Sequence, residues 1–189
     1  MGGLEFQIVS NSEADTKAIG ATLAELLTPG SIVGLTGDLG AGKTRLVQGA
    51  VAALGSDDPV VSPTFMLVRE YDAEVPVHHV DAYRLSGPAE LEDIGLDNVL
   101  DPAAIVFVEW AGTVEAALSG GWLEIRIDTV GDTGRVMTVL PHDGPWPARM
   151  GELKAALAAF QGDSLDDRPV SGSGQLGTGR TGSGQLGSS

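Results

Sequence analysis

The glycine-rich stretch GDLGAGKT, from Gly37 to Thr44, constrains the fold of this 189-residue chain more than any other feature. It satisfies the pattern G-x-x-x-x-G-K-[ST], in which glycines let the backbone curl and point several N–H groups inward. An apolar run over residues 32–36 precedes the loop and is typical of a buried strand. Apolar residues then recur at helical spacing: Leu46, Val47, Ala50, Val51 and Leu54. This order of strand, loop and helix predicts an α/β protein that can hold phosphate groups.

Strand and helix patterns alternate along the rest of the chain as far as residue 161. Helix patterns cover residues 18–27, 88–94 and 150–160. The first of these follows an N-cap at Ser12 and ends before Pro29. The strand patterns cover residues 4–8, 66–71, 77–80, 105–108, 123–127 and 136–140. We therefore expect an α/β, P-loop NTPase-type, three-layer fold around a central mixed, partly parallel sheet.

The composition changes near Gly162. From there to Ser189 the chain consists mainly of Gly, Ser, Gln and Thr, with SGSGQLG from Ser171 and TGSGQLG from Thr181. Such a segment buries too little apolar surface to offset its ordering entropy. We expect a P-loop ATPase domain over 1–161 and a disordered Gly/Ser-rich tail over 162–189.

The charge of the chain limits its direct partners. The formal net charge is -15 and the sequence pI is about 4.3, which argues against direct, electrostatically driven binding of nucleic acid. The absence of cysteine excludes disulfides, thiolate catalysis and cysteine-ligated zinc. The sequence shows no signal peptide and no apolar run long enough for a membrane span, so we expect a cytoplasmic location and no membrane contact.

The loop chemistry indicates a nucleoside triphosphate with Mg²⁺. Lys43 is expected to reach the β- and γ-phosphates, and the Thr44 hydroxyl to ligate Mg²⁺. The positive end of the following helix adds to the attraction for anions. A strongly acidic chain can therefore hold a polyphosphate by local geometry, and hydrolysis of the nucleotide is expected.

Two acids are candidates for positioning the metal and a water molecule. Asp81 follows the strand pattern at 77–80, and Glu109 follows the more apolar pattern at 105–108. We favour Glu109 and expect Asp81 beside it. The alternatives are a turn or cap residue for Asp81 and a solvated strand end for Glu109.

Two further motifs lie near these acids. His78 and His79 are adjacent on a strand and point to opposite faces, so packing or surface roles are expected for them, with His79 able to hydrogen-bond near the nucleotide. In Ser62-Pro63-Thr64-Phe65, Thr64 stands where P-loop enzymes place a γ-phosphate sensor, and a simple proline turn is the alternative.

These motifs together resemble one family. GDLGAGKT, SPTF from Ser62, HVDAYR from His79, AELEDIGLD from Ala89 and VEW from Val108 are similar to the TsaE (YjeE) family, the bacterial ATPases of tRNA threonylcarbamoyladenosine synthesis. The resemblance covers about residues 6–140. It implies ATP hydrolysis in support of TsaB and TsaD, which modify the adenosine next to the anticodon of ANN-decoding tRNAs, with tRNA contacted only indirectly through the complex.

The resemblance also implies site residues. Thr64 is implied as the γ-phosphate switch, Asp81 as the Walker-B-type acid, and Glu109 as a second acid on Mg²⁺. The implied catalytic residues are Lys43, Thr64, Asp81 and Glu109, and the implied metal ligands are Thr44, Asp81 and Glu109. The implied nucleotide-binding residues are Gly37, Asp38, Gly40, Ala41, Gly42, Lys43, Thr44, Arg45, Glu13, Trp110 and Arg135.

Alternative functional hypotheses stay open at this point. A small-molecule kinase with a P-loop and a non-catalytic nucleotide-switch module are the alternatives to an ATPase. Residues 86–100 carry acids but no Lys or Arg, so no arginine-rich lid is evident. Arg45 stands where many relatives have Thr or Ser, and Arg84 is either a charge stabiliser or a partner contact.

Overall fold

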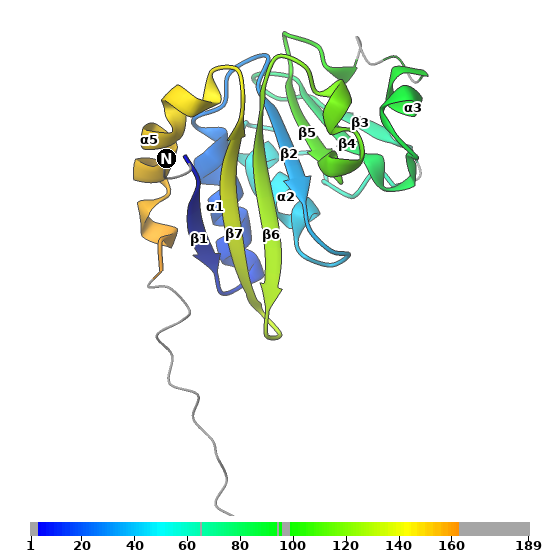
Figure 1. Ribbon diagram of the computed structural model, residues 1–189. Coiled ribbons are helices and arrows are strands. Elements are labelled where there is room, and N and C mark those ends of the chain that lie inside the picture. The colour runs from blue at the N-terminus through cyan, green and yellow to red at the C-terminus, as the bar shows by residue number, and fades with distance from the viewer. Residues whose placement is uncertain (1–3, 65, 94, 96–98, 163–189) are drawn as a thin grey trace, which may run out of the picture.

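The computed structural model describes residues 4–64, 66–93, 95 and 99–162. In that part of the chain, the strands form one seven-stranded sheet of order β1-β7-β6-β2-β5-β4-β3 (Figure 1). Strand β2 pairs in parallel with β5 and β6, and β4 pairs in parallel with β5, whereas the other pairs are antiparallel. The strands are β1 Phe6–Ser10, β2 Ile32–Thr36, β3 Val68–Tyr71, β4 Val77–Asp81, β5 Ile105–Glu109, β6 Trp122–Val130 and β7 Gly134–His142. The expected mixed, partly parallel sheet is confirmed.

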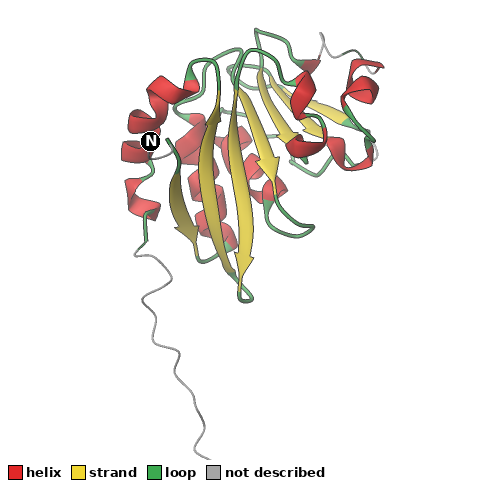
Figure 2. Cartoon of the chain, viewed as in Figure 1, coloured by secondary structure: helices red, strands yellow, loops and turns green. Residues whose placement is uncertain are grey.

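Helices lie on both faces of this sheet, as Figure 2 shows. The α-helices are α1 Glu13–Ala24, α2 Lys43–Ala53, α3 Pro88–Asp93 and α5 Trp146–Ala156, and the 3-10 helices are η1 Ala82–Arg84, η2 Ala111–Thr113, η3 Glu115–Ala117 and η4 Ala158–Phe160. Helices α1, α2 and α5 pack on one face in the larger hydrophobic core. Helix α3 with η1, η2 and η3 packs on the other face, over β2, β4 and β5. The three-layer expectation is confirmed.

The central strands are the most deeply buried elements. All five residues of β4 and all five of β5 are buried, which explains their unbroken apolar runs. In β6, by contrast, burial gives way to exposure toward the end of the strand. Because β2, β4 and β5 are parallel neighbours, their carboxyl ends meet at one edge of the sheet, where Asp81 is the register partner of Glu109.

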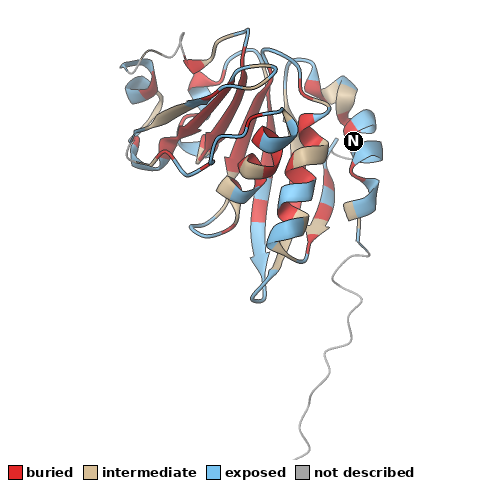
Figure 3. Ribbon diagram, turned by 180° about the vertical axis from the view of Figure 1, so that it is seen from behind, coloured by how far each residue is buried: buried red, intermediate tan, exposed pale blue. Residues whose placement is uncertain are grey.

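Helices α1 and α2 pack closely against each other, and both carry buried residues, coloured red in Figure 3, between exposed ones. A Cβ atom on Gly20 would lie 2.1 Å from the Leu46 carbonyl oxygen, so this crossing requires glycine. The expected cap is confirmed, since Ser12 Oγ accepts from the Asp15 N–H at 3.1 Å. Ile19 and Gly20 are buried, whereas Ala18, the first residue of the predicted helix pattern at 18–27, is exposed.

Several element ends differ from the sequence prediction. Strand β3 begins two residues later than expected, since Leu67 has a φ of 65° and cannot continue an extended strand. Helix α1 ends at Ala24, before the expected end at residue 27, and α5 begins four residues earlier than expected, with a proline in its first turn. Residues 163–189 lie outside the described part, so the tail stays a prediction. No described helix is long and apolar enough to cross a membrane.

Candidate functional site

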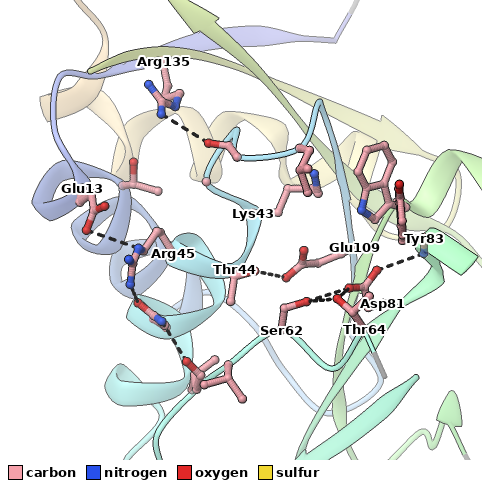
Figure 4. A pocket seen from close by; sticks show the side chains of 18 of the residues that line it. Glu13, Lys43, Thr44, Arg45, Ser62, Thr64, Asp81, Tyr83, Glu109 and Arg135 are labelled. Atoms are coloured by element: carbon pink, nitrogen blue, oxygen red, sulfur yellow. Dashed lines mark hydrogen bonds and ion pairs between the residues drawn. The ribbon is translucent and has the colours of Figure 1, made fainter. Parts of the chain in front are cut away.

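A cavity of about 850 Å³ opens at the carboxyl ends of β2, β4 and β5 (Figure 4). Eleven of the sequence-predicted site residues line it: Glu13, Gly40, Gly42, Lys43, Thr44, Arg45, Thr64, Asp81, Glu109, Trp110 and Arg135. Gly37, Asp38 and Ala41, also predicted, do not line the cavity but belong to the loop beneath it. Residues separated by more than 100 positions in the chain therefore share one pocket.

The loop from Gly37 to Thr44 owes its shape to positive backbone angles. Gly37 has a φ of 138°, and a Cβ atom there would lie 2.3 Å from the Ile127 carbonyl oxygen, so no other residue fits. Gly42, with a φ of 112°, is the N-cap of α2 and offers no capping side chain. The first N–H groups of α2 consequently lack a side-chain cap, which is the arrangement that binds anions at helix N-termini.

Lys43, the first residue of α2, is buried against the loop residues that precede it. Its Nζ donates to the carbonyl oxygens of Gly37 at 2.7 Å and Asp38 at 2.9 Å, and lies 4.0 Å from the centroid of the Trp110 ring. Burial lowers the pKa of Lys43, against the opposing attraction of Glu109 and other nearby acids. The ammonium group is thus held at the pocket by carbonyl groups that a phosphate oxygen can replace.

The Thr44 hydroxyl donates to Glu109 Oε1 at 2.7 Å (Figure 4). His79 Nε2 lies 2.9 Å from the same oxygen. Thr44 belongs to the first turn of α2, Glu109 ends β5 and His79 lies within β4. A hydroxyl that gives its proton to a carboxylate keeps its oxygen lone pairs for another ligand. This pairing therefore leaves the lone pairs of the Thr44 oxygen available to a further ligand.

Asp81 uses both of its carboxylate oxygens. Its Oδ2 accepts from Ser62 Oγ at 2.7 Å and from Thr64 Oγ1 at 2.6 Å, and its Oδ1 accepts from the Tyr83 N–H at 3.0 Å. The bond to Tyr83 caps η1, so the alternative interpretation of Asp81 as a cap residue is also confirmed. Asp81 fastens the loop that carries Ser62 and Thr64 to the end of β4.

Two arginines, Arg45 and Arg135, border the side of the pocket opposite Asp81 (Figure 4). Arg45 pairs with Glu13 at 3.3 Å and donates to Gln48 at 3.0 Å, so in this structure its guanidinium faces α1 rather than the loop carbonyls. Arg135 reaches from β7 and donates Nε–H to the Ala41 carbonyl oxygen at 2.8 Å. Arg135 therefore holds the loop from Gly37 to Thr44 against the strand pair β6–β7.

The oxygen donors in the cavity fit a magnesium ion whose remaining coordination positions would be filled by phosphate oxygens. Within the described residues, no three His, Cys, Asp or Glu side chains come together as a self-sufficient metal site. The oxygen atoms of Thr44, Glu109 and Asp81 are instead the hard donors that Mg²⁺ prefers, and Mg²⁺ is usually held by one or two carboxylates together with substrate phosphates.

Comparison with known proteins agrees with this geometry. A family model described as "Threonylcarbamoyl adenosine biosynthesis protein TsaE" matches residues 10–137, a range that includes every residue lining the cavity. The chain belongs to the TsaE family. The resemblance inferred from the sequence motifs is confirmed.

The matches to individual TsaE relatives cover most of each relative's length. The tRNA threonylcarbamoyladenosine biosynthesis protein TsaE of Bacillus subtilis (strain 168) is 40% identical over 73% of this chain and 85% of its own. That of Streptomyces coelicolor is 45% identical over 62% of this chain and 82% of its own. A structure titled "Crystal structure of Bacillus subtilus YdiB" has a TM-score of 0.67 and 31% identity, and covers 82% of this chain and 95% of that one.

Some pocket residues of this TsaE-family chain were not predicted from its sequence. Ser62 and Tyr83 lie inside the quoted motifs, where their hydroxyl and aromatic side chains were the available signal. Asp132 and Thr133 come from the turn between β6 and β7, which carries no recognisable motif. The other unpredicted lining residues are Ser12, Thr16, Leu39, Gln48, Val60 and Val61.

Proposed function

We propose that this protein binds ATP with Mg²⁺ in the cavity at the ends of β2, β4 and β5 and hydrolyses it in support of threonylcarbamoyladenosine formation on tRNA. The observation that carries the proposal is the convergence of Lys43, Thr44, Asp81 and Glu109 on one cavity beside a helix N-terminus without a side-chain cap. A phosphate loop, a hydroxyl metal ligand and neighbouring acids are the parts that nucleotide hydrolysis requires.

Each residue has a defined task in this proposal. Lys43 exchanges the carbonyls of Gly37 and Asp38 for phosphate oxygens, and the first N–H groups of α2 bind the same phosphates. Thr44 and Glu109 hold Mg²⁺, since Thr44 already gives its proton to Glu109. The bound ion supplies charge neutralisation for the β- and γ-phosphates.

The loop with Ser62 and Thr64 is proposed as the part that responds to the γ-phosphate. In this structure the Thr64 hydroxyl is committed to Asp81. A γ-phosphate with its metal ion would offer the Thr64 hydroxyl and the Asp81 carboxylate alternative partners, so contacts of this loop would change when the nucleotide binds. The proposed switch therefore lines the same cavity as the proposed nucleotide site.

The partners proposed from the family resemblance are TsaB and TsaD. A formal net charge of -15 disfavours direct contact with the phosphate backbone of tRNA, so we propose that tRNA is reached through the complex. The adenine is proposed to lie toward Glu13 and its neighbours at the start of α1, which line the same cavity.

Calorimetric titration of ATP with Mg²⁺ tests the site directly. The wild-type protein is expected to bind, and Glu109→Gln to bind about 10- to 100-fold more weakly in Mg²⁺ because a metal-holding carboxylate is lost. Glu115→Gln, an exposed acid on η3 that does not line this cavity, is the matched control and should bind normally. Transfer of phosphate to a small acceptor, in place of hydrolysis, would identify a kinase and contradict the proposal.

A further inference from the structure

We propose that His79 is a positioning residue for Glu109: its Nε2–H donates to Oε1 and fixes the carboxylate, leaving the other oxygen, Oε2, for the metal–nucleotide complex. The inference rests on the proposed function, because the complex that Glu109 would meet is the ATP and Mg²⁺ assigned above.

The contact between these two residues is fully enclosed. The His79 side chain is 0% exposed and that of Glu109 is 5% exposed, with Nε2 and Oε1 2.9 Å apart. Asp81 lies two residues beyond His79 on β4, so both side chains project from the same face of the sheet toward the cavity edge. His79 is therefore placed beneath the two acids and is absent from the cavity lining.

The hydrogen-bond pattern assigns the proton to Nε2. An ionised carboxylate only accepts hydrogen bonds, so the Nε2 nitrogen must donate to Glu109. The other ring nitrogen, Nδ1, is buried and has no hydrogen-bond partner among the described residues. A buried nitrogen without a partner is unfavourable, and an apolar side chain would avoid that cost, so the function of the ring lies in its bond to Glu109.

Two donors share one oxygen of Glu109. Within the described part of the chain, the hydrogen bonds from Thr44 and His79 both end on Oε1. If the bond to His79 is removed, Thr44 alone orients the carboxylate, and Thr44 must also serve the metal. Residues that hydrogen-bond to metal-holding groups typically change metal affinity by about 10- to 100-fold when they are mutated.

His78 is the natural control. It is the neighbouring residue on β4, is also buried, and points to the opposite face, where its Nδ1 lies 2.8 Å from the Val99 carbonyl oxygen. His78→Leu removes a buried imidazole from the same strand without touching Glu109. Comparison of the two positions separates damage to β4 from loss of the Glu109 contact.

The experiment measures affinity for a fluorescent ATP analogue as a function of Mg²⁺ and again in EDTA. We expect His79→Leu to raise the half-saturating Mg²⁺ concentration about 10- to 100-fold while leaving the affinity in EDTA unchanged. His79→Gln, whose amide nitrogen can replace Nε2, should restore most of the Mg²⁺ dependence, and His78→Leu should preserve it. If His79→Leu does not fold, the comparison of His79→Gln with His79→Asn decides, since the shorter Asn cannot reach Glu109.

Three results would overturn the inference: a folded His79→Leu protein with wild-type Mg²⁺ dependence, equal losses in Mg²⁺ and in EDTA, or a His79→Gln protein no better than His79→Leu or His79→Asn. A wild-type protein without any Mg²⁺-dependent ATP binding would instead refute the proposed function itself.

Discussion

Asp81 and Glu109 are register partners at the ends of β4 and β5, yet their carboxylates hold hydroxyl groups from different parts of the chain. Glu109 accepts from Thr44 in α2, whereas Asp81 accepts from Ser62 and Thr64 in the loop before β3. Two adjacent acids thus connect Thr44 and the loop that carries Ser62 and Thr64 to a common sheet edge. Mutations at the two positions should consequently have different effects.

Asp81→Asn should loosen the loop at residues 61–64. Asparagine keeps a single accepting oxygen, so it cannot accept from the Tyr83 N–H and from the hydroxyls of Ser62 and Thr64 at once, and the contacts that hold the loop to β4 are weakened. Hydrogen exchange of the backbone amides in this loop should become faster in Asp81→Asn and stay unchanged in Glu109→Gln. Equal exchange in both variants would contradict the division of roles between the two acids.

Lys43→Met should abolish ATP binding while making the ligand-free protein more resistant to heat at neutral pH. Burial lowers the pKa of Lys43, so the unfolded chain holds this proton more tightly than the folded protein does. The penalty therefore falls as the pH rises through the folded pKa toward the ordinary value of 10.5. Melting temperatures measured across that range should converge, and a variant that is less stable than the wild type at neutral pH would refute this account.

Arg135→Leu should weaken ATP binding by about tenfold, because the phosphate loop loses a charged hydrogen bond of about 1.5–3 kcal/mol at the Ala41 carbonyl. Arg149→Leu is the matched control, since Arg149 also donates to a backbone carbonyl, that of Leu26, at 2.6 Å, far from the cavity. Titration of both variants should show a loss of affinity only for Arg135→Leu. A similar loss for Arg149→Leu would mean that general stability, and not the loop, sets the affinity.

Glu124→Gln should destabilise the protein at neutral pH by about 2 kcal/mol. Burial by itself would raise the pKa of Glu124, but hydrogen bonds from Thr36 and His142 and the charge of Arg126 outweigh it and lower the pKa below 4.5. Because a lowered carboxyl pKa stabilises the fold above 4.5 and that contribution disappears as the pH falls through the folded value, the two proteins should unfold alike in acid. Denaturant titrations at several pH values measure the difference, and a difference independent of pH would be contrary to this assignment.

Gly49→Ala should destabilise the protein by about 3 kcal/mol or more, since the new Cβ atom would lie 1.9 Å from the Lys17 carbonyl oxygen in α1. Gly151→Ala is the control, because Gly151 lies in α5 with nothing within 4 Å of its Cβ position. This variant should be more stable than the wild type by about 0.5–1 kcal/mol. Chemical unfolding of both variants tests whether α1 and α2 pack as closely as described; a neutral Gly49→Ala would show that they do not.

The sequence predicted the parts of the site that local chemistry determines. The glycine positions of the phosphate loop, with Lys43 and Thr44, follow from a motif whose spacing is imposed by phosphate geometry. Asp81 and Glu109 follow from their positions after apolar runs, because parallel strands end at one edge. Their expected proximity is confirmed by the pairing of β4 with β5.

Other features depend on tertiary contacts that no local pattern contains. Gly20 and Gly49 are weak helix formers in the sequence, and only the structure shows that they permit the close crossing of α1 and α2. Thr133 enters the cavity because β7 pairs with β6 and β1, an arrangement that involves residues more than 100 positions apart.

The most direct test of the central claim is ATP hydrolysis measured with Mg²⁺, with and without purified TsaB and TsaD. The account predicts that ATP is hydrolysed at a rate that rises when both partners are present and falls by about 100-fold or more in Glu109→Gln. Absence of hydrolysis and of association in ATP and Mg²⁺, or full partner-stimulated hydrolysis by Glu109→Gln, would contradict it.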